Sequence, residues 1–497
     1  MNITALNKIL PRWKAASKRT HSADSKVAFW AGKDKEKMLP ALVEAWTTQT
    51  PTADDVTRLA VAVDDEDDTA RKDFDYYCIP ATPAMFSLIE LCWEKFIRYQ
   101  RHFWQRKGLT LSAVDLAEYR VLVAGALSAV VNAELTDPTI EGVTFSRTKA
   151  WYSIRSRYRP LHVNRRFLPV IDALTECGLF QQVRGQAWRS HTRPESGVDK
   201  SLIRSTRTLR NLMVDCHVTS PLDTSWDRTG QEIIRRKKDK TSAFDEYSDL
   251  DVLANGYRLE MQHVNELLWK SNILVINREG LPFIDVRDRF LQRQFTYASW
   301  TSGGRLLGGF WTPMSKVDRR ERILLNGERT VELDYNSIPF HSLYASVNAA
   351  PPAADIYHIT GTDPASRSGI KTLMLALTFD KKPNRRKFPK GSGNKFTKAD
   401  RAKGARKIIE LIKTQHRPIA HLLGDNKGHG LQFIESQVII AALSQLKQEG
   451  LIGLPVHDCL VVPISQADRI SVIMQSVSLK ITGCQIPSHG KVGLITC

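Results

Sequence analysis

Two apolar runs that each carry an aspartate constrain the fold of this chain most strongly. In the run Thr330–Tyr335, β-branched and apolar residues lead to Asp334. In the run Leu454–Pro463, His457 and Asp458 interrupt an otherwise apolar stretch. Such runs predict buried strands, and a polar dipeptide inside one predicts the tip of a β-hairpin. Carboxylates on two rigid strands can converge on a metal ion, although an ordinary turn with a hydrogen-bonded Asp explains the second run equally well alone.

Magnesium is the ion that such a pair would suit. It prefers hard oxygen ligands and commonly takes only one or two protein carboxylates beside substrate phosphates. Two such ions can activate an attacking hydroxyl and stabilise a leaving pyrophosphate in phosphoryl transfer. We therefore expect Asp334 and Asp458 to be catalytic metal ligands for Mg²⁺.

A candidate triphosphate-binding helix lies between the two runs. Arg367, Lys371, Leu375 and Phe379 are spaced four residues apart, so a helix places them on one stripe. The two cations could neutralise a triphosphate while the apolar pair stacks against a base. An amphipathic helix with basic, solvated ends has the same pattern and is the competing interpretation.

A glycine turn upstream could bring a strand close to a nucleic-acid backbone. The segment Thr301–Leu306 contains two consecutive glycines followed by Arg305. Glycine–arginine turns are common, so this signal is weak alone.

The charge of the chain favours a polyanionic partner. There are 71 Lys and Arg against 53 Asp and Glu, which gives a formal net charge of +18. Basic surfaces of this kind attract nucleic-acid phosphates in a salt-sensitive way. A polymer suits this charge better than a mononucleotide, which disfavours a small-molecule nucleotidyltransferase.

The cysteines and the apolar runs bear on the compartment. Seven scattered cysteines form no Cys-x-x-Cys pair, so neither a disulfide framework nor a zinc site is indicated. The N-terminus lacks the apolar core of a signal peptide, and no run of eighteen apolar residues exists. We expect a cytoplasmic protein with no membrane partner, and a monomer.

Residues 144–194 have the composition of a nucleic-acid-binding module. Basic and aromatic residues interleave from Arg147 through Trp151 and Arg155, followed by a predicted helix over 166–176, a strand over 179–183 and a basic loop. Helix, helix, strand and basic loop is the order of a winged-helix module. Arginines with aromatics suit phosphate contact and base stacking. We expect Arg147, Trp151 and Arg155 to contact nucleic acid, although many helix–strand units look alike.

The fold class predicted for the whole chain is α+β. We expect an N-terminal helical region over 1–80, helices (Met85–Phe103 and Ser112–Glu134) with the candidate winged-helix module over 81–195, a linker with thumb-like helices over 196–285, and a catalytic domain over 286–497. Within that domain, residues 380–407 are rich in Lys and Arg with glycines in the middle, which predicts a mobile basic loop that holds nucleic acid.

Taken in order, these motifs resemble two families of single-subunit polymerases. Thr-x-x-Gly-Arg, a strand ending Asp-Tyr, Arg-x-x-x-Lys with an aromatic eight residues on, and Val-His-Asp in a hairpin are similar to family A DNA polymerases and phage-type RNA polymerases. The segment Leu431–Gln437 also looks like the helix that precedes their hairpin. The resemblance covers roughly residues 290–480, and the broader pattern further resembles compact palm proteins of bacteria and mobile elements.

The resemblance implies a palm with reduced fingers and assigns roles by position. Asp334 and Asp458 would bind metal, Arg367 and Lys371 the triphosphate, and Arg305 and Thr301 the template–primer duplex. Tyr335, Leu375 and Phe379 would contact the substrate, Gln437 the nucleic acid, and His457 the primer end or Asp458. From the resemblance we also expect Lys371 and His457 to be catalytic residues.

Departures from those families leave the sugar preference open. Cys459 follows the hairpin aspartate where family A DNA polymerases carry Glu. Pro339 stands where they use a Glu to exclude the ribose 2′-hydroxyl, and Phe379 replaces their Tyr. We predict a DNA-templated nucleotidyltransferase that uses nucleoside triphosphates, with RNA synthesis slightly favoured. The alternatives are a DNA polymerase of replication or a mobile element, and a non-catalytic replication or regulatory protein with a degenerate palm.

Overall fold

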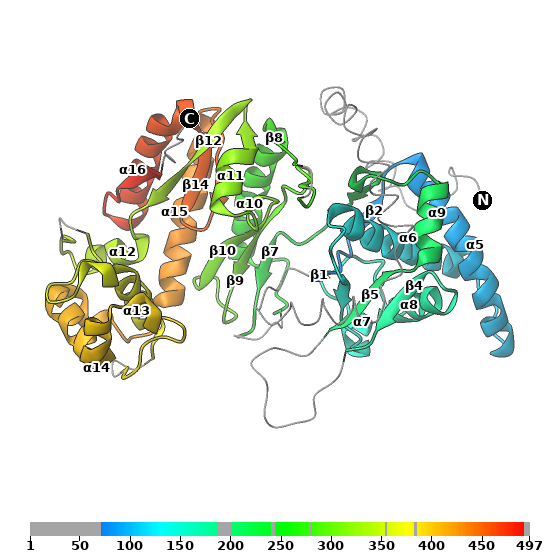
Figure 1. The fold of residues 1–497 in the computed structure, drawn as a ribbon, viewed down its shortest axis with the longest axis horizontal. Helices are drawn as coiled ribbons and strands as arrows, with labels where there is room; N and C mark the ends of the chain where they lie inside the picture. Colours follow the sequence, from blue (N-terminus) through cyan, green and yellow to red (C-terminus); the bar gives the residue numbers. More distant parts are fainter. Residues whose placement is uncertain are drawn as a thin grey trace. The chain divides into compact units, whose positions relative to one another are not determined.

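The structure, a computed structural model, describes residues 71–185, 200–239, 244–278, 281–352, 355–381 and 385–491. These residues form two compact units, whose elements are labelled in Figure 1. The first comprises the described residues up to Gln231 with Arg278–Asp285, and the second comprises Glu232–Asn277 and the described residues from Val286. The predicted segment 196–285 is thus divided between the units. The helices expected before residue 71 lie outside the described residues.

The first unit combines a four-stranded sheet with five α-helices among its described residues. Its elements are β1 (Arg71–Asp73), β2 (Cys78–Pro80), α5 (Pro83–Arg106), α6 (Ala113–Thr136), β3 (Gly142–Phe145), α7 (Lys149–Ser153), α8 (Phe167–Glu176), β4 (Phe180–Val183), β5 (Ser201–Ser205), α9 (Arg207–Asp215), η2 (Pro221–Asp223) and β6 (Thr224–Trp226). The sheet has the order β1-β3-β5-β4, while β2 pairs with β6.

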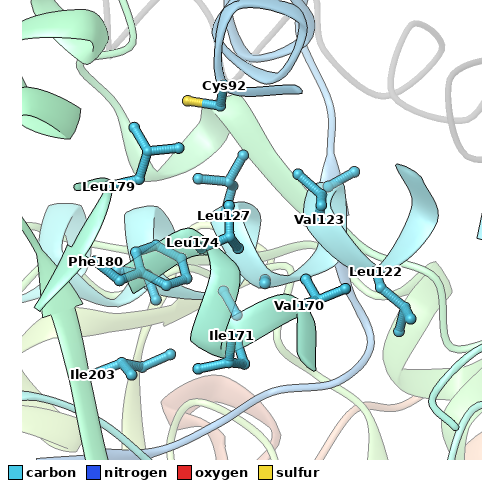
Figure 2. Packing of buried hydrophobic residues seen from close by; sticks show 14 of the residues in the cluster. Cys92, Leu122, Val123, Leu127, Val170, Ile171, Leu174, Leu179, Phe180 and Ile203 are labelled. Carbon is cyan, nitrogen blue, oxygen red and sulfur yellow. The ribbon is translucent and has the colours of Figure 1, made fainter. Parts of the chain in front are cut away.

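Helix α6 runs through the core of the first unit because it is apolar on nearly every side. It begins at a capping box in which Ser112 and Asp115 exchange hydrogen bonds with each other's backbone. Leu122, Ala126 and Val130, which are spaced four residues apart and so share one face of the helix, are buried. Figure 2 shows Leu122, Val123 and Leu127 packed with side chains of α8, β4 and β5. Both long helices predicted in this region are confirmed.

The strand order of this unit is that of a winged helix. The chain runs α6, β3, α7, α8, β4, β5, and β5 lies between β3 and β4, antiparallel to both. The predicted helix over 166–176 and strand over 179–183 correspond to α8 and β4. In the basic stretch 147–159 only five residues, Lys149–Ser153, are helical. Much of the expected basic loop falls in residues 186–199, outside the described residues.

The second unit is built on two sheets and several helices. Its elements are β7 (Ile234–Arg236), α10 (Val252–Lys270), β8 (Ile273–Val275), β9 (Leu291–Phe295), β10 (Gly303–Gly308), α11 (Lys316–Arg322), β11 (Ile323–Leu325), β12 (Glu328–Tyr335), α12 (Ile338–Ser346), η3 (Pro364–Ser366), α13 (Arg367–Phe379), η4 (Gly393–Lys395), α14 (Lys398–Gln415), η5 (Arg417–Leu422), α15 (Gly428–Gln448), β13 (Leu454–Val456), β14 (Cys459–Pro463), η6 (Ile464–Gln466), α16 (Ala467–Thr482) and β15 (Ser488–Lys491). The predicted α+β class is confirmed.

The larger sheet has β12 at its centre. Its order is β13-β14-β12-β11-β8, and β15 pairs with β12 beside β11. The strand β12 is antiparallel to β14, β11 and β15. Helix α16 packs on β12 and β14 and also contacts α15 (Figure 1). The predicted strand over 330–335 and the hairpin over 454–463 are both confirmed.

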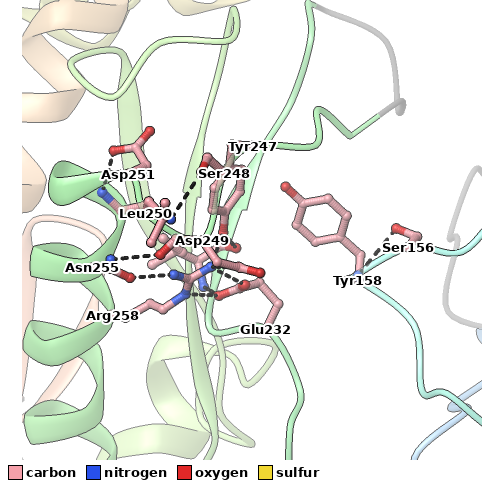
Figure 3. A network of polar contacts seen from close by, with 12 residues as sticks. Ser156, Tyr158, Glu232, Tyr247, Ser248, Asp249, Leu250, Asp251, Asn255 and Arg258 are labelled. Carbon is pink, nitrogen blue, oxygen red and sulfur yellow. Dashed lines mark hydrogen bonds and ion pairs between the residues drawn. The ribbon is translucent and has the colours of Figure 1, made fainter.

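The smaller sheet, β10-β9-β7, is tied to α10 by a polar network (Figure 3). Asp251 caps α10 by accepting from the Ala254 amide, and its other carboxylate oxygen accepts from the Trp300 indole at 2.7 Å. Arg258 binds Glu232, which precedes β7. These contacts hold the turn between β9 and β10 against α10, and that turn contains Thr301.

A separate apolar cluster surrounds α13. It draws buried side chains from α12, α13, α14, η5 and the start of α15. Phe396 is buried in this cluster, where it packs on Gly369 of α13 and on Phe388. The expectation of a mobile loop over 380–407 is therefore wrong for its described part, because Phe388 and Phe396 anchor the basic segment and α14 begins at Lys398.

Candidate active site

The first predicted carboxylate, Asp334, lies near the end of β12. Strand alternation turns Asp334 and Glu332 to one face of the sheet and Tyr335 to the other. Glu332 is buried and forms an ion pair of 2.8 Å with Arg319, so its charge is already compensated. Tyr335 is buried and its hydroxyl donates to the Met474 carbonyl at 2.6 Å. The position of Tyr335 in the core gives no support to its predicted contact with the substrate.

The second carboxylate, Asp458, is at the tip of the β13–β14 hairpin next to Asp334. Cys459 pairs directly with Asp334 across the strands, and the Tyr335 amide donates to the Asp458 carbonyl at 3.3 Å. His457 occupies the turn with a φ of 55° and has an exposed side chain. Burial and the neighbouring charge of Asp334 raise the pKa of Asp458. The two carboxylates therefore lie close enough for their charges to repel each other.

This pair fits a divalent cation that also binds substrate phosphates. Its donors are hard carboxylate oxygens, and a bound cation would relieve the repulsion that raises the Asp458 pKa. Among the described residues, no group of three or more His, Cys, Asp and Glu side chains is placed to hold a metal ion. The remaining ligands would thus come from substrate and water.

The stripe on α13 is present and lies at the surface. Arg367, Lys371 and Phe379 are exposed and Leu375 is half-buried, whereas the opposite face of the helix is in the core. The charge of Lys371 lowers the pKa of Asp458, which places its ammonium group within electrostatic reach of the carboxylates. Arg367 forms an ion pair with Asp355, including a 3.0 Å hydrogen bond.

Tyr357, which the motifs did not indicate, links α13 to the strand that carries Asp334. Its ring lies under both cations, 5.3 Å from the Arg367 guanidinium carbon and 5.6 Å from the Lys371 nitrogen. Its hydroxyl is 2.8 Å from that of Ser337, which follows β12 with a φ of 62°. Burial, with a contribution from the charge of Asp458, raises the Tyr357 pKa to about 12. Tyr357 thus contacts both cations and Ser337, and it lies within electrostatic reach of Asp458.

Glu435, also missed from the sequence, is a third carboxylate at this site. It lies on α15 and accepts from Arg305 in an ion pair of 3.0 Å, with the Glu435 side chain buried and that of Arg305 partly exposed. Burial raises the pKa of Glu435 to about 7, the charge of Arg305 opposes that shift, and the charge of Asp458 adds to it. Arg305, predicted to bind nucleic acid, is therefore oriented by Glu435.

The glycine turn has a steric explanation. A Cβ on Gly304 would lie 2.7 Å from the Ser436 hydroxyl oxygen, and the φ of Gly304 is +82°. This close approach lets Arg293 of β9 bridge the strands to α15, with hydrogen bonds to the Gly304 carbonyl, Ser436 and Gln437. The side-chain oxygen of Gln437 thus accepts a hydrogen bond from the buried Arg293. Thr301 is exposed in the turn before Gly303.

Three aromatic rings from different elements meet at the far end of the stripe. The imidazole of His429, at the start of α15, lies 5.0 Å from the Phe379 ring and 4.7 Å from the Tyr297 ring. Phe379 also packs against Gly428, where a Cβ would lie 2.4 Å from the ring. Phe379 is therefore positioned by these contacts while 37% of its surface remains exposed.

His489 is a further neighbour of the carboxylates that no motif indicated. It lies on β15 directly opposite Asp334, and opposite residues in an antiparallel pair share a face of the sheet. Its side chain is exposed.

The residues predicted to bind nucleic acid in the first unit are only partly available. Arg147 forms two hydrogen bonds to Asp172, of 2.7 and 2.8 Å. Trp151 is 39% exposed, but one face is covered by the Arg159 guanidinium at 4.5 Å. Arg155 is exposed in the loop after α7. Of these three, Arg147 is the least suited to phosphate contact because its charge is compensated.

Comparisons with known proteins add little to this geometry. No protein-family model matches the chain, and no curated protein does. Among solved structures, the POL domain of Pol1 from M. smegmatis in complex with DNA primer-template and dNTP aligns with 15% identity and a TM-score of 0.25. The alignment covers 52% of this chain and 57% of that one. A TM-score this low does not establish a shared fold. A function therefore has to be inferred from the geometry of the site itself. No described helix is long and apolar enough to span a bilayer.

Proposed function

We propose that the second unit is a template-directed nucleic-acid polymerase that transfers a nucleotide from a nucleoside triphosphate to a 3′-hydroxyl. One observation carries this proposal: two carboxylates that repel each other lie within electrostatic reach of a cation on the α13 stripe. Asp334 and Asp458 lie side by side on β12 and the β13–β14 turn, and Lys371 is close enough to lower the pKa of Asp458. A carboxylate pair beside a cationic surface matches the needs of phosphoryl transfer.

The carboxylates are assigned to Mg²⁺. Asp334 and Asp458 would hold the ions, and when bound these supply charge for activating the attacking hydroxyl and for stabilising the leaving pyrophosphate. The raised pKa of Asp458 favours its protonated form, so the site should lose metal affinity as the pH falls.

The chain's own cations would position the triphosphate. Lys371 and Arg367 present their charges from successive turns of α13, and the Tyr357 ring beneath them restricts where they can go. Arg367 is paired with Asp355 in this structure, so binding a phosphate requires it to exchange one anion for another. Fixed cations of this kind stabilise charge that develops on the transferring group.

Residues of β10 and of the turn before it would hold the nucleic acid. Arg305 extends from β10 and is oriented by Glu435, while the turn containing Thr301 is fixed through Trp300 and α10. Tyr297, Phe379 and His429 form an aromatic edge on which a base could stack. We propose DNA as the template, with either sugar in the growing strand.

Primer extension with carboxylate variants tests this proposal. Asp334→Asn and Asp458→Asn keep the side-chain size but remove the charges, so each should lower the rate of extension by at least about 10³-fold. Primer–template affinity should change little. Glu328→Gln, at the other end of β12, is the control and should extend normally. Near-normal extension by either aspartate variant would contradict the metal assignment.

The same assay separates the enzyme from a non-catalytic binding protein. Both readings predict binding that weakens as salt rises. Only a polymerase releases pyrophosphate when a matching triphosphate and magnesium are supplied. Tight binding without pyrophosphate from any template and any triphosphate would favour a regulatory or replication protein with a degenerate site.

A further inference from the structure

The C-terminal half of α5 presents an uncompensated basic surface in the first unit. Its exposed cations are Lys95, Arg98, Arg101 and Arg106, and Lys107 follows directly. No acidic residue lies between Lys95 and Lys107, although Glu94 directly precedes Lys95. Within the part of the chain that the structure describes, none of these five cations forms an ion pair. We call residues 95–107 the α5 stripe.

Several other arginines of this unit form ion pairs with carboxylates, in contrast to those of the α5 stripe. Arg120 pairs with Glu90, and Arg166 with Asp115 and Glu118. The winged-helix element α8 is no better suited to phosphates, because Asp172 and Glu176 lie on its outer side. Of α5 and α8, the helix that better fits a polyanion is therefore α5, and not the one that the winged-helix order would suggest.

Aromatic side chains stand among the cations of the α5 stripe. Tyr99 is 38% exposed and Phe103 is 40% exposed. They are four residues apart and so lie one helical turn apart, about 6 Å along the axis. Lys95, His102 and Arg106 flank them at helical spacing. Proteins that bind single-stranded nucleic acid commonly have exposed aromatic rings between cations, because bases stack on the rings while the cations contact the phosphates.

We infer that the α5 stripe binds single-stranded nucleic acid without sequence preference. The cations supply phosphate contacts, which are independent of sequence. Tyr99 and Phe103 supply stacking, which every base can make and which a paired duplex cannot offer without unstacking. The α5 stripe belongs to the first unit and the carboxylates belong to the second, and binding to the stripe needs neither magnesium nor a nucleotide.

Binding of the full-length chain to labelled oligonucleotides tests this inference. A single strand of 30 nucleotides and the matching duplex are titrated without magnesium or triphosphate. Three variants are compared: Arg98→Gln/Arg101→Gln/Arg106→Gln, Tyr99→Ala/Phe103→Ala, and the control Lys72→Gln/Arg204→Gln/Arg207→Gln. The control removes the same charge from exposed positions elsewhere in the unit.

The charge variant should weaken single-strand binding at least about tenfold and reduce the slope of log affinity against log salt by about 2, since each phosphate contact contributes about 0.7. The aromatic variant should weaken single-strand binding about tenfold or more while leaving duplex binding within about threefold. The control should stay within about threefold for both ligands.

Three results would overturn the inference. Equal losses in the charge variant and its control would mean that net charge alone acts. An aromatic variant with normal single-strand affinity, beside a weakened charge variant, would identify a duplex surface. Binding to anionic vesicles that depends on the α5 stripe, without any effect on oligonucleotide binding, would identify a membrane surface. Because no synthesis is measured, each of these outcomes leaves the proposed polymerase function standing.

Discussion

At the scale of single residues, the sequence indicated some members of the candidate site and not others. Asp334 and Asp458 could be identified from the sequence because a charged residue in an apolar run needs a reason. Glu435, Tyr357 and Arg293 could not, because each lies in an ordinary helix, loop or strand. Their roles arise from contacts between segments 20 to 144 residues apart, which no local pattern reports.

Glu435 should make stability depend on pH. Between its ordinary value of 4.5 and its folded pKa of about 7, the folded chain binds more protons at Glu435 than the unfolded chain does. The free energy of unfolding should therefore fall as the pH rises through this window, by roughly 3 kcal/mol in total from this group. Glu435→Gln should remove that fall, as measured by denaturant unfolding between pH 4.5 and 8.

Glu449, at the C-terminal cap of the same helix, provides the control. It pairs with Arg469 at the surface, and hydrogen bonds from Gln445 and Arg469 lower its pKa. Glu449→Gln should therefore leave the fall between pH 4.5 and 8 in place. An unchanged pH dependence in Glu435→Gln would show that Glu435 does not titrate in that window.

Elements were predicted well wherever their pattern is local. The strands and hairpin that carry the aspartates, the stripe on α13 and both long helices of the first unit follow from periodicity. The pairing of β15 with β12 was not predicted, because it joins segments about 150 residues apart. The packing of Phe388 and Phe396 was also missed, because composition dominated by Lys and Arg hid two anchoring rings.

The helix α13 should act on the nucleotide. Lys371→Ala removes a charge-assisted contact, which is typically worth about 1.5–3 kcal/mol. The kcat/KM for nucleotide should fall about 10- to 100-fold with template affinity nearly unchanged. Lys480→Ala, on the exposed side of α16, is the matched control and should be neutral. Loss of template affinity with normal nucleotide kinetics would assign α13 to the duplex.

The approach of β10 to α15 should not tolerate a side chain at Gly304. Gly304→Ala would place Cβ against the Ser436 hydroxyl, which is fixed by Arg293. Gly327→Ala is a control with nearly the same φ, +83°, and open space around it. Both variants carry the left-handed penalty of about 1–2 kcal/mol. Gly304→Ala should lose a further ~1–3 kcal/mol in denaturant unfolding, and equal losses would mean that the contact with Ser436 is not tight.

At the scale of the whole molecule, the two units carry different candidate sites. The second unit carries the paired carboxylates and the α13 stripe, and the first unit carries a winged-helix arrangement and the α5 stripe. The excess of Lys and Arg favours a polyanionic partner, but composition could not say which cations are compensated. Arg147 and Arg166 are paired, whereas the cations of α5 are not among the described ion pairs. That distinction requires a structure.

Sugar choice is a property of the assembled pocket. Pro339 and Phe379 offer no carboxylate or phenol to exclude a ribose 2′-hydroxyl, and an apolar pocket rejects an added hydroxyl by only about 10²-fold. Ribonucleotides should therefore be incorporated measurably, with RNA synthesis slightly favoured. Competition between NTPs and dNTPs on one primed template measures this preference. A preference for dNTPs beyond about 10⁴-fold would show that another side chain excludes the ribose.

Template direction is the central claim, and homopolymer templates test it most directly. Four primed templates, each with a single repeated base, are offered four labelled triphosphates one at a time in the presence of magnesium. We predict that each template supports incorporation of its complementary nucleotide alone, and that Asp458→Asn abolishes all four reactions. Incorporation that ignores the template, or no incorporation from any combination of template and triphosphate, would contradict the account.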